Sequence, residues 1–186
     1  MIKNFFKNHP IHKKIVIYFD LFYLLNPLNY FLIWVMLSIG MYLGLFILNQ
    51  SPQFLTNFEY KVFFLFIGIT SLMSSHYIEL QLLESKSTSS IEFVKNKYSI
   101  NFILQFKKYL NISGFVFLFF SYWINFLLGI ILFFINKFVL KDYSKNISIL
   151  KIIYHLLISF TISMCGLIYI LKDYQLFPLV FIYLKL

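Results

Sequence analysis

The chain has 186 residues, of which 60% are hydrophobic, 22% aromatic and only 12% charged, whereas about a quarter of the residues in an average soluble domain are charged. A soluble domain of this length buries about two-thirds of its surface, too little to hide so many apolar side chains, so lipid must cover the rest. The composition excludes a soluble enzyme and a disordered chain, and it predicts an integral membrane protein.

Positive charge dominates the polar residues. The net charge is +9 at pH 7, and all sixteen basic residues are Lys, which excludes chemistry that depends on the bidentate guanidinium of Arg. The lysines lie between apolar runs, a pattern typical of loops on the anionic side of a bilayer. We therefore expect membrane lipids and no nucleic acid as partners. The chain also lacks Ala and favours residues with AT-rich codons, which indicates an AT-rich genome.

The first 27 residues form an N-terminal cytoplasmic or interfacial segment, and residues 28–186 form the membrane bundle. Lys13 to Leu25 is predicted to be a short helix at the interface, with Phe19 and Phe22 on its apolar side. A cleaved signal peptide is not expected, because Asp20 interrupts the run and no Ala-x-Ala site exists in a chain without Ala.

The first predicted span is Leu28 to Leu48. It has no charge over about 21 residues, a length of about 31 Å at helical rise, which matches the hydrocarbon core of a bilayer. Gly40 and Gly44 form a small-residue notch, which favours general helix packing over a specific dimer. Asn49 to Tyr60 follows as a short external loop.

The second predicted span is Val62 to Leu83, whose second half carries a cluster of polar side chains. Ser85 to Ser99 is then a polar, Lys-containing loop on the cytoplasmic side. Tyr109 to Leu140 is too long for one straight span, so it is predicted to be a hairpin with its turn near Ser121 to Asn125.

Ile152 to Leu171 is a fifth span, and Leu176 to Leu184 begins a sixth. The lysines gather at one side of this topology, which places the N-terminus on the cytoplasmic side. The fold class is therefore all-α: a multi-pass transmembrane helical bundle of about five to six spans.

Glu79 is the acid deepest in an apolar helix. Ser75 and His76 lie four and three residues before it and share its face, whereas Glu84 falls about 140° around the helix. Two interpretations stay open. Glu79 and Glu84 extend to the inner headgroups and mark a helix end, or Glu79 belongs to a cation or diphosphate-metal site at the inner mouth of the bundle.

His155 lies one turn into the fifth span, with no second His near it in the sequence. An imidazole hydrogen-bonded to a neighbouring helix is the expected role. Gly-rich phosphate loops, His-Glu-x-x-His and a Ser nucleophile elbow are all missing from the sequence, so no catalytic motif of a soluble enzyme is present.

Three sequence segments, at the start of the first span, at the end of the second span and after the hairpin, occur in the order found in one protein family. Asn26-Pro27-Leu28-Asn29 opens the first span, a polar cluster ends the second, and Tyr143-Ser144 followed by Leu150-Lys151 is in register with a Tyr-Ser-x-Pro-Pro-x-x-Leu-Lys loop. Over nearly the whole chain, this order resembles the UbiA family of membrane prenyltransferases.

The resemblance implies an all-helical bundle that transfers a prenyl group from an isoprenyl diphosphate to an aromatic or other lipid-soluble acceptor. Mg²⁺ would bridge the diphosphate to two aspartate-rich motifs and neutralise the leaving group. By position, Glu79 is the candidate metal ligand. The candidates for the diphosphate or metal side are Ser75, His76, Glu79, Glu84, Tyr143 and Lys151.

This sequence departs from the family pattern at several points. Ser75 and His76 stand where the family's first Asn-Asp pair is expected, and Leu83, which cannot bind Mg²⁺, stands in place of the last Asp of that motif. Asn146 and Ile147 replace the two prolines of the loop. We therefore expect either a partial reading frame or a shortened, diverged relative, and in both cases these residues alone do not form a complete prenyltransferase site. The alternative is a non-catalytic multi-span subunit or scaffold.

Overall fold

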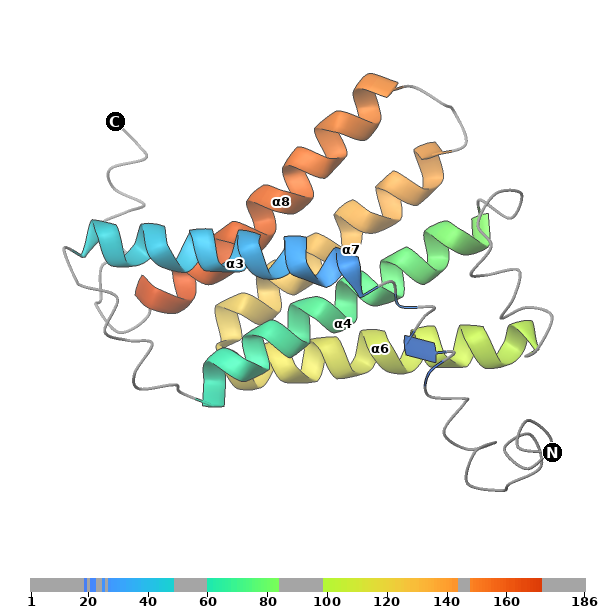
Figure 1. Cartoon of the computed structure of the whole chain (residues 1–186), viewed down its shortest axis with the longest axis horizontal. Coiled ribbons are helices and arrows are strands. Elements are labelled where there is room, and N and C mark those ends of the chain that lie inside the picture. Colours follow the sequence, from blue (N-terminus) through green and yellow to red (C-terminus); the bar gives the residue numbers. More distant parts are fainter. Residues whose placement is uncertain are drawn as a thin grey trace, which may run out of the picture.

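The computed structural model describes residues 19, 21–22, 25, 27–48, 60–83, 99–143 and 148–171. The described part of the chain is all-α and contains five helices (Figure 1). In chain order they are α3 (Leu28–Ile47), α4 (Tyr60–Leu83), α6 (Ile100–Ser121), α7 (Trp123–Tyr143) and α8 (Ser148–Leu171).

Three stretches of these helices are long and apolar enough to cross a bilayer: Tyr30–Ile47, Tyr60–Leu82 and Ile152–Leu171. They coincide with the first, second and fifth spans predicted from the sequence. Apolar helices of this length and number need hydrocarbon or a large core around them, and a chain of this size buries too little surface to provide such a core. The protein is therefore an integral membrane protein of the all-α class.

The predicted hairpin is present as α6 and α7. Tyr122 lies between the two helices in an extended conformation (φ −169°, ψ 137°), within the predicted turn. Its backbone N–H donates to the carbonyl of Leu118 (3.1 Å), and its own carbonyl accepts from the N–H of Phe126 (3.2 Å). The chain thus changes direction over a single residue, and both backbone polar groups of that residue are paired.

The first arm of the hairpin begins at Ile100 and not at Tyr109. The Ser99 hydroxyl accepts a hydrogen bond from the N–H of Phe102 (3.3 Å) and caps the helix. Lys107 and Lys108 precede the apolar run that starts at Tyr109. Because Lys is a good helix former, the helix includes both residues and begins further upstream. The two arms have 22 and 21 residues, about 33 and 32 Å at helical rise.

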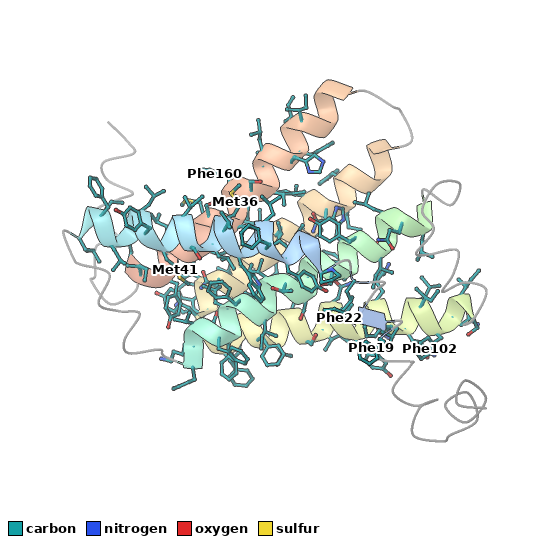
Figure 2. The ribbon with its side chains drawn as sticks, viewed as in Figure 1. Phe19, Phe22, Met36, Met41, Phe102 and Phe160 are labelled. Atoms are coloured by element: carbon teal, nitrogen blue, oxygen red, sulfur yellow. The ribbon has the colours of Figure 1, made fainter. Side chains whose placement is uncertain are left out.

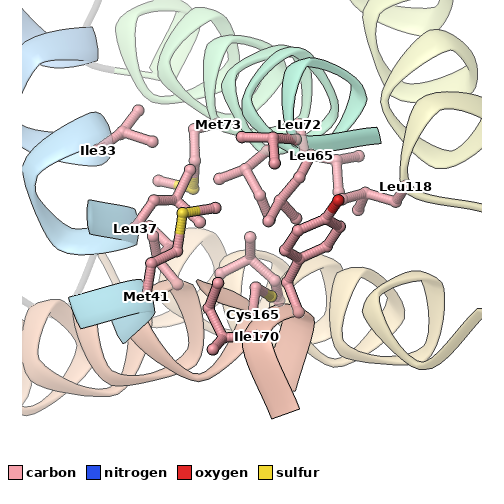
Figure 3. Packing of buried hydrophobic residues seen from close by; sticks show 14 of the residues in the cluster. Ile33, Leu37, Met41, Leu65, Leu72, Met73, Leu118, Cys165 and Ile170 are labelled. Carbon is pink, nitrogen blue, oxygen red and sulfur yellow. The ribbon is translucent and has the colours of Figure 1, made fainter. Parts of the chain in front are cut away.

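The helices pack in two pairs. α3 lies mainly against α8 and α4 mainly against α6, while α7 contacts α8, α6 and α4 and joins the pairs (Figure 1). α3 and α4 make few contacts with each other. Apolar side chains fill the centre between the pairs, and Figure 3 shows part of this core: Ile33, Leu37 and Met41 of α3, Leu65, Leu72 and Met73 of α4, Leu118 of α6, and Cys165 and Ile170 of α8.

Two glycines allow α3 and α8 to approach at backbone distance. A Cβ added to Gly40 would lie 1.8 Å from the carbonyl oxygen of Ser163, and one added to Gly166 would lie 2.3 Å from that of Leu37. Gly44 faces Ile170 of the same helix pair. The notch predicted from Gly40 and Gly44 therefore packs two helices of one chain, as expected.

The outer surface is apolar on all five helices (Figure 2). Phe31 of α3 is 73% exposed and Phe160 of α8 is 65% exposed, and similar side chains project from α4, α6 and α7. A small soluble protein rarely exposes so much contiguous apolar surface to water. Lipid is the solvent that this surface fits.

The predicted interfacial helix, Lys13 to Leu25, lies mostly outside the described residues. Within it, Phe19 and Phe22 are exposed, whereas Leu21 and Leu25 pack against the α4 and α6 helices. The predicted loops Asn49 to Tyr60 and Ser85 to Ser99, and the partial sixth span Leu176 to Leu184, also lie outside the described residues apart from their boundary residues Tyr60 and Ser99.

Candidate functional site

Three of the residues predicted for a site come together on α4. Ser75, His76 and Glu79 line one crevice between α4, α6 and α7, together with Leu72, Asn111, Phe133, Asn136 and Lys137. The Ser75 hydroxyl donates to the Asn111 side-chain carbonyl (2.6 Å). The free volume is about 10 Å³, room for no more than about one water molecule. This crevice is therefore too small for an organic ligand.

Glu79 is the centre of an ion triad that joins three helices. Lys137 of α7 donates to Oε1 (2.8 Å) and Oε2 (3.1 Å), and Lys107 of α6 lies 3.0 Å from Oε2. The carboxylate side chain is 23% exposed. Two ammonium groups thus share one carboxylate at the end of the bundle, which leaves a net charge of +1 on the triad.

The sequence did not identify Lys107 and Lys137 as partners of Glu79. The signal was present, because the predicted hairpin puts both lysines at the same end of the bundle as Glu79. Neither of the two open interpretations of Glu79, an acid extending to the headgroups or a metal ligand, included an ion pair between helices. Only the rotation of α6 and α7 about their axes brings the three charges within contact distance.

The described residues do not fit a magnesium site. Mg²⁺ needs several oxygen ligands in near-octahedral geometry, and both oxygens of Glu79 are taken by ammonium groups. Among the described residues there is no group of three or more His, Cys, Asp or Glu that could hold a metal ion. A role for Mg²⁺ stays a prediction from the family resemblance.

The other predicted site residues are not brought to Glu79 by any described contact. Glu84 lies outside the described residues. Tyr143 ends α7 and Lys151 lies in the first turn of α8, but only the backbone is described at both positions. Their proposed role on the diphosphate side stays a prediction.

His76 and His155 line one small cavity of about 50 Å³ between α3, α4 and α8. The sequence showed no second His near His155, and the tertiary structure supplies one from another helix. His76 is buried, and its Nδ1 has no hydrogen-bond partner. His155 makes no hydrogen bond within the described part of the chain, so the expected bond to a neighbouring helix is not observed there.

A larger pocket of about 490 Å³ lies on the other side of α4, between α3 and α4. Because α3 pairs with α8 and α4 with α6, the space between α3 and α4 is left unfilled by side chains. Trp34 (47% exposed) and Phe63 (54%) belong to its wall, so it opens toward the lipid. None of its described lining residues is charged; they are Leu25, Tyr30, Trp34, Phe63, Phe66, Ile67, Thr70, Ser71, Ser74 and Leu110.

Hydroxyl groups form one side of this pocket. The Trp34 indole N–H donates to Thr70 Oγ1 (3.0 Å), and the hydroxyls of Ser74 and Tyr30 lie 3.0 Å apart. These bonds connect α3 and α4 across the pocket. An apolar cavity with a few convergent polar groups is the usual form of a small-molecule site, and its volume falls within the usual range of about 300 to 1,000 Å³.

Comparison of the chain with protein-family models, with curated proteins and with solved structures gives no match. The fold and the site define a class: an all-α integral membrane protein with a lateral apolar pocket on one side of α4 and an ion triad on the other.

Proposed function

We propose that this protein is a UbiA-like membrane protein that binds a lipid-soluble molecule, such as a prenylated substrate or acceptor, in the pocket between α3 and α4, with its N-terminus on the cytoplasmic side. The pocket is the observation that carries the proposal. Its volume of about 490 Å³ and its uncharged lining suit the apolar part of such a molecule. Its opening lies where a hydrophobic ligand arrives, in the bilayer.

Binding is the part of the proposal that the geometry supports best, and prenyl transfer is the further part that the family resemblance suggests. Transfer needs a group that neutralises the departing diphosphate. Lys107 and Lys137 are cations of this kind, but each is paired with Glu79, and the crevice beside them has a free volume of only about 10 Å³. We therefore expect binding of the apolar ligand to be measurable whether or not turnover occurs.

A photoreactive isoprenyl probe tests the binding. In membranes containing the protein, we expect the probe to crosslink to residues of the pocket wall and to be displaced by excess unlabelled isoprenoid. Ser71→Phe fills the pocket and should abolish the crosslink. Ser38→Phe is the matched control, because Ser38 is exposed on α3 and does not line the pocket.

Transfer itself is tested with a labelled isoprenyl diphosphate and a mixture of lipid-soluble acceptors, with and without Mg²⁺. A labelled lipid product that is lost in Ser71→Phe and kept in Ser38→Phe would support the enzyme. A specific crosslink without product would support a binding protein that does not catalyse transfer.

The second candidate is a non-catalytic multi-span subunit or scaffold. The ion triad favours it, because the Glu79 carboxylate of α4 pairs with Lys107 of α6 and Lys137 of α7 and links the three helices. Polar residues of this kind stabilise helix packing in membranes without any ligand. If the protein shows neither crosslinking nor transfer in the two assays, that result favours this function over the proposed one.

A further inference from the structure

The hydroxyls of the pocket between α3 and α4 have defined donors and acceptors. A hydroxyl has one proton and two lone pairs. Thr70 gives its proton to the carbonyl of Phe66 (2.6 Å) and accepts from Trp34 (3.0 Å). One lone pair of Thr70 Oγ1 stays open, and Thr70 has no proton left for a ligand.

Ser74 and Tyr30 follow the same rule. Ser74 Oγ lies 2.6 Å from the carbonyl oxygen of Thr70 and 3.0 Å from Tyr30 Oη. A carbonyl only accepts, so the single proton of Ser74 goes to Thr70, and the Tyr30 hydroxyl donates to Ser74. Tyr30 Oη therefore offers acceptor lone pairs to the pocket and no donor.

Ser71 is different. It lines the pocket and makes no hydrogen bond within the described part of the chain, so its hydroxyl keeps its proton. The pocket thus presents one free donor, Ser71, beside acceptors on Tyr30 and Thr70. The described lining residues carry no charge that would bind an ionised head group.

We propose that the pocket selects a neutral lipid alcohol, an apolar chain or ring that carries a hydroxyl group. An alcohol donates its proton to Tyr30 or Thr70 and accepts one from Ser71, which matches the open groups on both sides. A carbonyl lipid can use only the Ser71 donor, and an ether lacks the proton that the acceptors need. A phosphate head would require several donors or cations that the pocket does not offer. This inference rests on the proposed function and specifies its ligand.

The protein provides its own fluorescent reporter for the test. It has two Trp residues, Trp34 in the pocket wall and Trp123 on the outer surface. In a Trp123→Phe background, the emission of Trp34 reports directly on the pocket. The 186-residue protein in neutral-lipid nanodiscs is titrated with farnesol, farnesyl methyl ether, farnesal and farnesyl phosphate.

We expect farnesol to bind about fivefold more tightly than the methyl ether, because one net hydrogen bond is worth about 1 kcal/mol and 1.4 kcal/mol is tenfold in affinity. Tyr30→Phe should reduce this preference, and Ser71→Ala should weaken farnesol and farnesal alike. Tyr42→Phe is the matched control, since Tyr42 is exposed on the same helix and lies outside the pocket.

The outcomes separate the two proposals. Equal affinity for the alcohol and the ether, or tightest binding of the phosphate, would overturn the alcohol preference while the lipid-binding function stands. If bilayer lipid fills the pocket instead, none of the four probes changes the Trp34 emission, and the proposed function and this inference fail together. Because the comparison of alcohol with ether is made on the Trp123→Phe protein with an intact pocket, it decides the question even if Tyr30→Phe does not fold.

Discussion

Gly40→Ala is the substitution that the packing of α3 on α8 makes most costly. Its added Cβ would lie 1.8 Å from the Ser163 carbonyl oxygen, 2.7 Å from the carbonyl carbon and 3.0 Å from Cα. All three atoms are backbone, so no side chain can rotate away. Ordinary contact begins at about 3.4 Å, so the two helices must separate by about 1.6 Å at this point.

A separation of this size removes much of the attraction between the helices. A radial gap of 0.5 to 1 Å already forfeits a quarter to a half of the van der Waals well. Buried Leu37 and Met41 of α3 and Cys165 of α8 lie in the same core and would lose contacts. Overpacking typically costs about 1 to 3 kcal/mol, and a backbone clash belongs at the upper end. Ala gains about 1 kcal/mol over Gly in helix propensity, so we expect a net loss of about 2 kcal/mol.

Gly129→Ala is the matched control, because it makes the same chemical change on another helix. Its Cβ would lie 2.5 Å from Leu118 Cδ1, the end of a flexible side chain that can turn aside. The gain in helix propensity then offsets most of the cost, and stability should change by less than about 1 kcal/mol.

Reversible unfolding of both variants in mixed micelles, as the denaturing detergent fraction rises, measures the difference through the helical circular dichroism signal. Gly40→Ala should unfold at a clearly lower detergent fraction than Gly129→Ala. If the two variants are equally stable, the backbone-distance packing of α3 on α8 described here is wrong.

Three further predictions concern other parts of the bundle. Glu79→Gln should lower the free energy of unfolding by about 1 to 2 kcal/mol, because it leaves two ammonium groups without their shared carboxylate; unchanged stability in the same micelle assay would show that the triad does not hold the helices. Asn125→Leu should raise stability by about 1 kcal/mol or more, because the Asn125 side chain is fully buried with neither polar atom hydrogen-bonded, and a loss would reveal a partner for that amide. For orientation, a membrane-impermeant thiol reagent applied outside should label a cysteine at Gln53 and not one at Thr88, while the buried Cys165 stays unlabelled; outer labelling at Thr88 would reverse the proposed topology.

The sequence by itself determined the class of the protein and most helix positions. Long apolar runs flanked by polar or Lys-containing segments predicted the spans beginning at Leu28 and Val62 and the span ending at Leu171, and the structure confirms these helices. The hairpin turn near Tyr122 was also predicted. These features follow from local chain properties, namely the length of an apolar run and the residues that flank it, and such properties are readable without knowing any partner.

The sequence did not predict that α6 begins at Ile100, because hydropathy marks the apolar part of a helix and not its first residue. The helix passes through Lys107 and Lys108, which a hydropathy criterion excludes and helix propensity permits. The deciding signal is the cap at Ser99, whose effect depends on one hydrogen bond. A single serine within a polar stretch does not identify such a cap.

Only the tertiary structure decided which side chains meet. It paired Glu79 with Lys107 and Lys137, brought His155 to the same cavity as His76, and left a pocket between α3 and α4. The physical reason is that these contacts depend on which helices pair and on how each is rotated about its axis. Apolar residues lie on several sides of each described helix, so hydropathy alone does not mark the single buried face that would fix that rotation. Close packing at small residues such as Gly40 and Gly166 fixes it for α3 and α8, through contacts between positions far apart in the chain.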